Sequence, residues 1–103
     1  MRMESPMFII EVPEDLKEGF PVFIDRRHKD LEALELALSN SDANEIYEIG
    51  HRMKGTGSVY GFSELTKIGS ELVRLSEAKE LDSLKEVVTQ LKYALNNYKL
   101  KAN

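Results

Sequence analysis

The stretch IYEIGHRMKGTG (residues 46–57) holds the pattern that decides the fold. At about 100° per residue, one face of a helix through it collects apolar residues and glycines: Ile46, Ile49, Gly50, Met53, Gly57 and, just beyond, Tyr60. His51 lies about 140° from Ile46 on such a helix, so we expect its imidazole to meet water. Lys54 and Gly55 follow one turn later as its surface neighbours. The stretch predicts an amphipathic helix that exposes an imidazole, a cation and a bare patch of backbone.

Glycine inside a helix needs an explanation, because each one costs about 0.5–1 kcal/mol relative to alanine. Gly50 and Gly57 are expected on the apolar face, where a missing side chain lets a neighbouring helix come close. Gly55 falls on the solvent face, where packing cannot explain it, and Ser58 further along is also small. We infer that a large partner, shaped to surround the imidazole, comes close to His51. The alternative is that Gly55 begins a helix C-cap, since the residues after it are weak helix formers.

Four helical patterns follow a short irregular start and a helical turn that Pro13 opens. We expect the helices at about residues 21–38, 43–60, 63–78 and 84–98, separated by short polar turns. No strand-like alternation extends over a useful length. Short loops between helices of similar length imply antiparallel neighbours. The sequence therefore predicts an all-α fold, an antiparallel up-down-up-down four-helix bundle with a short N-terminal helical turn.

The helical periodicity and the residues that flank each helix also predict where the helices start and which positions face the core. Asp42 with Glu45, Ser63, and Ser83 with Glu86 are the predicted N-caps. The inward face of the first helix is expected to comprise Phe20, Phe23, Ile24, Leu31, Leu34 and Leu38. Its outward face is expected to include Asp30, Glu32 and Glu35. The apolar residues between Phe8 and Val12 are expected to lie against the body of the bundle.

Composition narrows the class of protein. A chain of 103 residues is long enough for one modest core, and 42% hydrophobic with 31% charged residues fits a soluble globular domain. Cysteine is absent, and neither histidine has a second ligand at metal spacing, so we expect no metal site. The net charge of −4 argues against nucleic-acid binding. No apolar run reaches the length of about 18 residues needed for a membrane span, and residues 7–10 are too short for a signal-peptide core. We therefore expect a cytoplasmic protein without membrane contact.

The residues around His51 resemble a known family. The run GHRMKGTG (residues 50–57), followed by SVYGF (residues 58–62) and a helix that begins SEL (residues 63–65), is similar to histidine-containing phosphotransfer (HPt) domains. The family pattern is His-x-x-Lys-Gly with small residues after it and then a turn of glycine and an aromatic residue. Val73 departs from the pattern, because many members carry glutamate there, but that position takes no part in the phosphorylation chemistry.

The resemblance extends beyond the motif to the first helix, and it covers about residues 13–98. It divides the chain into an N-terminal tail at residues 1–12 and an HPt-like helical bundle at residues 13–100. It implies a histidine phosphotransfer protein that relays a phosphoryl group between a receiver-domain aspartate, or a kinase, and His51 in a multistep two-component pathway. The expected partners are a response-regulator receiver domain, a hybrid sensor histidine kinase, or both, and the protein itself is expected to be a monomer.

The residues themselves suit this chemistry. A neutral imidazole is a competent nucleophile near pH 7, and phosphoryl transfer depends on in-line positioning and on stabilisation of charge on the equatorial oxygens. His51 is the expected acceptor, and Lys54 is expected to supply stabilising charge. The expected partner-docking residues are Tyr47, Glu48, Gly55 and Ser58. By analogy with the family, Mg²⁺ and the acidic pocket belong to the receiver. The chain is thus expected to need no cofactor and to act as a relay intermediate, not as an enzyme.

Other interpretations stay open at this stage. If the glycines around His51 are present for a reason other than partner contact, His51 is an ordinary solvated residue of the helix and Lys54 is an ordinary surface lysine. His28 lacks a Lys-Gly companion, which favours a solvated role. A helical adaptor that docks a receiver or kinase without being phosphorylated is the rival function, although such a protein should have lost the histidine or its lysine. A dimerising bundle, paired through residues 7–10 or the face around Tyr47, is the second rival.

Overall fold

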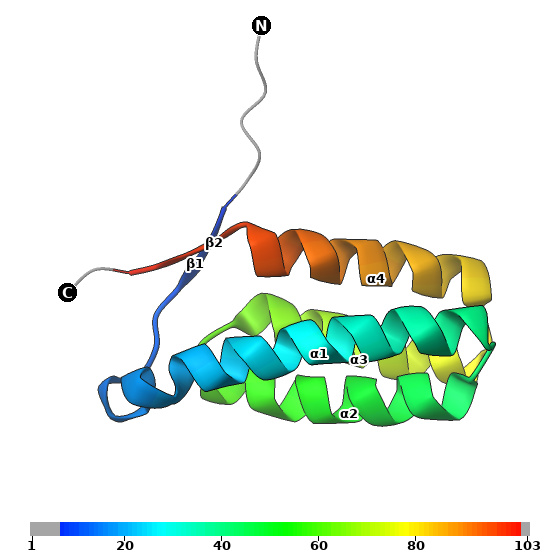
Figure 1. Ribbon diagram of the computed structural model, residues 1–103, viewed down its shortest axis with the longest axis horizontal. Helices are drawn as coiled ribbons and strands as arrows, with labels where there is room; N and C mark the ends of the chain where they lie inside the picture. The colour runs from blue at the N-terminus through cyan, green and yellow to red at the C-terminus, as the bar shows by residue number, and fades with distance from the viewer. Residues whose placement is uncertain (1–6, 102–103) are drawn as a thin grey trace, which may run out of the picture.

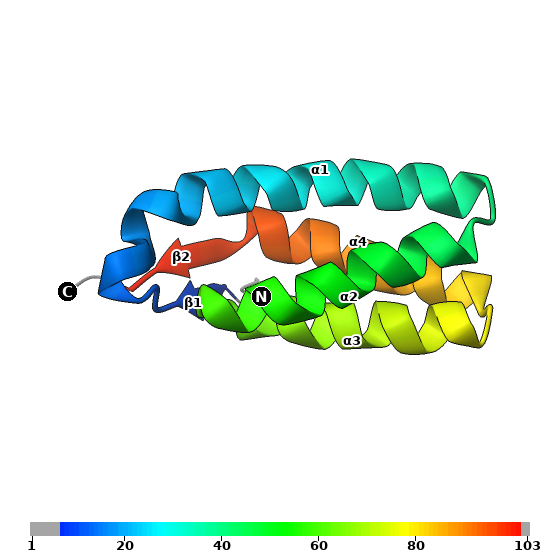
Figure 2. The same cartoon turned by 90° about the horizontal axis from the view of Figure 1, so that it is seen from below.

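The computed structural model describes residues 7–101 and shows a four-helix bundle with a small sheet at one end (Figure 1). The elements in chain order are β1 (Phe8–Ile10), the 3₁₀ helix η1 (Glu14–Gly19), α1 (Phe20–Ser39), α2 (Ala43–Val59), α3 (Ser63–Glu77), α4 (Leu81–Asn96) and β2 (Tyr98–Leu100). The colours of Figure 1 run out along α1, back along α2, out along α3 and back along α4. Figure 2 shows the same alternation from below. The predicted up-down-up-down helical bundle is confirmed.

The starts of the helices test the predicted caps. The side chain of Asp42 accepts a hydrogen bond of 3.1 Å from the backbone N–H of Glu45, as predicted for α2. The other two capping predictions are wrong. Helix α3 includes Ser63 as its first residue, and α4 already begins at Leu81, so Ser83 lies inside its first turn; neither helix has a side-chain cap.

The two strands were not predicted, because three residues are too few to show a period of two. β1 pairs with β2 in parallel, with Phe8 opposite Tyr98 and Ile10 opposite Leu100. Helix α4 ends before Tyr98, which the sequence had placed on the last helix. The predicted tail at residues 1–12 falls in part on residues 1–6, which lie outside the described residues. Ile10 and Val12 are buried and Phe8 is half-buried, as expected for a segment that lies against the bundle, whereas the expectation is wrong for Ile9, which is 61% exposed.

The core draws on all four helices, and the predicted apolar stripe of α1 fits it closely. Five of the six predicted inward residues of α1 are buried, and Leu38 is half-buried. The large apolar side chains that are fully buried on the other helices are Ile46, Ile49, Met53, Leu65, Ile68, Leu72, Leu84 and Leu91. The outward prediction holds for Glu32 and Glu35 but is wrong for Asp30, which is only 8% exposed.

Helices α2 and α3 come into close contact at glycines, among them Gly50 and Gly69. A Cβ atom placed on Gly69 would lie 2.5 Å from the backbone nitrogen of Lys54 and 2.7 Å from the carbonyl oxygen of Gly50. A Cβ atom on Gly50 would lie 2.7 Å from the Cβ atom of Leu72. These distances are too short for real side chains, so the two backbones touch because both positions are glycine. This contact fixes the turn of α2 that carries His51.

Candidate functional site

The solvent face of α2 brings together four of the predicted site residues. His51, Lys54, Gly55 and Ser58 are all exposed, and their spacing of three and four residues places them on one helical face. Their helix continues through Val59, so the alternative that Gly55 begins a C-cap is wrong. The hydroxyl of Ser58 donates a hydrogen bond of 3.3 Å to the carbonyl of Gly55 and thus stays close to the helix surface. These four residues form an exposed face of α2 that carries the imidazole.

Gly55 is the open part of this surface. A Cβ atom at Gly55 would have nothing within 4 Å of it, in contrast to Gly50 and Gly69. Packing within the described residues therefore gives no reason for glycine at this position. The helix retains a residue of poor helix propensity where the neighbouring imidazole is exposed.

The two remaining predicted docking residues precede His51 on the same helix. Glu48 is exposed, whereas Tyr47 is half-buried. The ring of Tyr47 lies parallel to the imidazole of His51, with 2° between the planes and 6.2 Å between the ring centroids. All six predicted site residues thus lie on α2.

A polar cluster with Arg27 and Asp30 buried at its centre joins α1 to the flank of this surface, and the sequence interpretation missed it. The guanidinium of Arg27 donates a hydrogen bond of 2.6 Å from Nη1 to the hydroxyl of Thr56 on α2. Its Nε lies 2.9 Å from Oδ2 of Asp30, and Nη2 of Arg52 lies 3.6 Å from Oδ1 of the same carboxylate. Thr56 in turn donates to the carbonyl of Arg52 at 3.1 Å. The cluster ties the turn of α2 after His51 to α1.

The electrostatics of the cluster centre on Asp30. Burial raises the pKa of this carboxyl above its ordinary value of 3.8, because desolvation penalises the charged form. The positive charges of Arg27 and Arg52 oppose that shift without cancelling it. One signal for the cluster was present in the sequence: Arg27 falls on the apolar stripe, three and four residues after Ile24 and Phe23. An arginine forced inward needs a carboxylate partner, and Asp30 is three residues away.

Other places in the described part of the chain carry less chemistry. His28 lies half-buried on α1, away from the glycines of α2. Among residues 7–101, no group of three histidine, aspartate or glutamate side chains is placed to hold a metal ion. No helix in the same range is long and apolar enough to cross a membrane.

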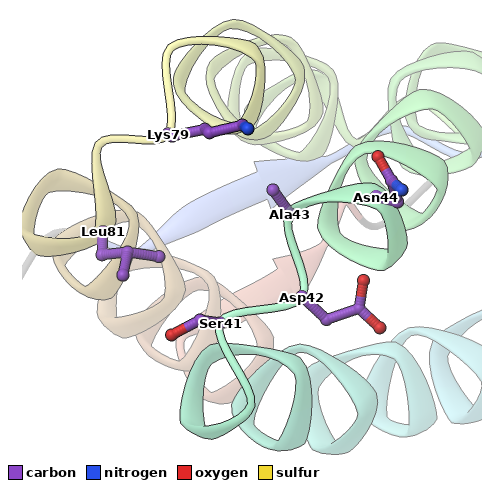
Figure 3. A pocket seen from close by; sticks show the side chains of 6 residues that line it. All are labelled: Ser41, Asp42, Ala43, Asn44, Lys79 and Leu81. Atoms are coloured by element: carbon purple, nitrogen blue, oxygen red, sulfur yellow. The ribbon is translucent and has the colours of Figure 1, made fainter.

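The hollow in Figure 3 lies between two turns at one end of the bundle. It is lined by Ser41, Asp42, Ala43, Asn44, Lys79 and Leu81. Figure 3 shows Lys79 reaching from the turn between α3 and α4 toward the start of α2. The lining holds no imidazole, and the carboxylate of Asp42, next to its serine, accepts the capping hydrogen bond from Glu45. The candidate site is therefore the exposed face of α2 and not a pocket.

A family model described as "Hpt domain" matches residues 20–99, which include all of α1, α2, α3 and α4. Neither the curated proteins nor the solved structures compared with the chain gave a match.

Proposed function

The chain belongs to the Hpt domain family, the histidine phosphotransfer modules of two-component phosphorelays, and we propose that His51 is the residue that carries its phosphoryl group. The observation that carries the proposal is the exposed imidazole of His51 beside Gly55, where nothing lies within 4 Å of the missing side chain. A partner domain has room to reach the imidazole there. His28 has no such space beside it on its own helix, since α1 contains no glycine.

In the proposed reaction, a nitrogen lone pair of the His51 imidazole attacks the phosphorus of a phosphorylated receiver aspartate. The new N–P bond forms as the P–O bond to the aspartate breaks, and the carboxylate leaves with the electron pair. The ring proton that becomes acidic passes to water. The reverse reaction returns the phosphoryl group to a receiver. The protein acts as an intermediate in the relay, and the receiver supplies Mg²⁺ and the acidic pocket.

Lys54 and the residues around it complete the proposed surface. The side chain of Lys54 is exposed, while its backbone packs against Gly69. A flexible side chain with a positively charged ammonium group is thus attached to a fixed backbone position one turn after His51. We assign it to the oxygens of the phosphoryl group. Glu48, Gly55 and Ser58 are assigned to contact with the receiver or the kinase, because they are exposed on the same helix.

The direct test is transfer from a phosphorylated receiver domain to the purified protein. We expect an adduct that is labile to acid and stable to base, as a phosphoramidate is. His51→Gln should abolish the adduct and leave the helical circular-dichroism signal and the melting temperature nearly unchanged, because the side chain is exposed.

His28→Gln is the matched control, since it removes the other histidine of the chain from a different helix. Labelling of the His51→Gln protein, or loss of labelling with His28→Gln alone, would contradict the assignment. A wild-type protein that binds the receiver but is never labelled would instead support the adaptor function.

A further inference from the structure

The imidazole of His51 has little to hold it in place. Within residues 7–101 it makes no hydrogen bond and no ion pair, and its one aromatic contact is with Tyr47. An exposed side chain without such partners changes rotamer on the picosecond to nanosecond timescale. In-line attack on phosphorus requires a narrow range of orientations of the imidazole. If the ring turned freely, most encounters with a phosphorylated receiver would not lead to transfer.

The ring of Tyr47 is placed to restrict this motion. It lies one helical turn before His51, at the spacing that brings side chains on a helix together. The planes differ by 2° and the centroids are 6.2 Å apart, which is within the range of 4.5–7 Å typical of aromatic pairs and matches an offset parallel arrangement.

Tyr47 is less exposed to solvent than His51. Its side chain is half-buried, whereas that of His51 is exposed. It lines a second hollow between the start of α2 and the end of α3, together with Ala43, Asn44, Ser76, Glu77 and Lys79. Five of these six residues belong to α2 or its neighbour α3, whose backbones are in contact further along at Gly50. A half-buried tyrosine ring with two rotatable torsions loses little conformational entropy when it is ordered, so it can restrict the motion of the imidazole beside it.

We propose that Tyr47 is a positioning residue for phosphoryl transfer: its ring stacks beside the imidazole of His51 and holds it in the orientation that accepts the phosphoryl group. The proposal rests on the assignment of His51 as the acceptor. It differs from the expectation that Tyr47 simply touches the partner, because a positioning residue acts through the imidazole in the absence of the receiver.

Two substitutions separate these roles. Tyr47→Phe keeps the ring and removes the hydroxyl, whereas Tyr47→Leu keeps an apolar side chain and removes the ring. In single-turnover transfer from a phosphorylated receiver, we expect Tyr47→Leu to lower the rate at saturating receiver by about threefold to tenfold. The receiver concentration at half-maximal rate should stay unchanged, and Tyr47→Phe should match the wild type.

Proton NMR of the free protein gives a readout that needs no partner. The ring of Tyr47 shifts the two carbon-bound protons of the His51 imidazole, and Tyr47→Leu should move these signals toward the positions of a free histidine while Tyr47→Phe leaves them in place. The imidazole of His28 on α1 is the internal control and should not respond.

The proposal is overturned if Tyr47→Leu retains the saturating rate, whether or not the half-maximal concentration rises; a rise alone would make Tyr47 a docking residue. Unchanged His51 signals in Tyr47→Leu would also overturn it. Failure of the proposed function looks different, because the wild type would then not be labelled at all while the NMR comparison would still report on the ring contact.

Discussion

Helix α2 carries glycine on two faces, and the surroundings of these glycines are opposite. A Cβ atom on Gly50 would lie 2.7 Å from the Cβ atom of Leu72, whereas one on Gly55 would have nothing within 4 Å. On the first face the absent side chain brings two helices of the same chain into contact. On the second face it leaves space that no described residue occupies. The same residue type thus stabilises the bundle on one side of α2 and leaves the other side free for a partner.

The largest effect is expected from a side chain added where α2 and α3 are in contact. Gly69→Ala would place a methyl group against the backbone of Lys54 and Gly50, which cannot move without separating α2 from α3. We expect a loss of about 2–3 kcal/mol in the free energy of unfolding, after allowance for the better helix propensity of alanine. Urea denaturation followed by circular dichroism measures it. Stability equal to that of the wild type would show that the helix contact yields easily.

A bulky side chain added to the exposed face of α2 should leave the fold intact and slow phosphoryl transfer. Gly55→Gln adds a long side chain to the open patch, and glutamine favours helix over glycine by about 0.5–1 kcal/mol. We expect a more stable protein whose phosphoryl transfer from the receiver is slower by about tenfold, equivalent to about 1.4 kcal/mol. Gly55→Ala is the control for size and should transfer faster than Gly55→Gln. Equal rates for the wild type and Gly55→Gln would mean that the patch serves another purpose.

A smaller effect on phosphoryl transfer is expected when the positive charge of Lys54 is removed from the same face of α2. Lys54→Ala should lower the transfer rate or the lifetime of the phosphorylated protein by a factor of about 2–5, because a single exposed charge contributes modestly. Lys54→Arg should retain part of the effect. The transfer rate and the half-life of the phosphorylated protein are measured at two salt concentrations, with Lys92→Ala on α4 as the control for net charge. If Lys54→Ala matches the wild type at low salt in both quantities, Lys54 has only a solubilising role.

The polar cluster between α1 and α2 should make the stability of the protein depend weakly on pH, through Asp30 of α1. The pKa of Asp30 is raised in the folded protein, so its contribution to stability is fully present below the ordinary value of 3.8 and is lost as the pH rises through the folded value. The wild type should therefore gain stability relative to Asp30→Asn as the pH falls from 7 to 4. Urea denaturation of both proteins at the two pH values gives this difference, and a change of opposite sign would contradict the shift.

Much of the outer face of α2 was predictable from the sequence, because a period of 3.6 residues fixes which side chains share a face. The open space at Gly55 and the exposure of His51 both follow from that period. Asp30 was placed wrongly because its charge was given more weight than its position. On the helical wheel it lies only about 20° from Phe23, beside the apolar stripe, and the inward Arg27 three residues before it pairs with its buried carboxylate. The ring contact between Tyr47 and His51 depends on rotamers, which a helical period does not determine.

The parallel pairing of β1 and β2 has a consequence for the order in which the protein assembles. It joins the first and last described segments, through hydrogen bonds from Phe8 to Asn97 and from Lys101 to Ile10, each of 2.9 Å. The entropy lost in closing so long a loop is recovered only after the intervening helices have packed. A pair of three-residue strands has little stability of its own. The amide protons of this pair should therefore exchange with solvent through a local opening, before those of α2 and α3, while the surface around His51 stays folded.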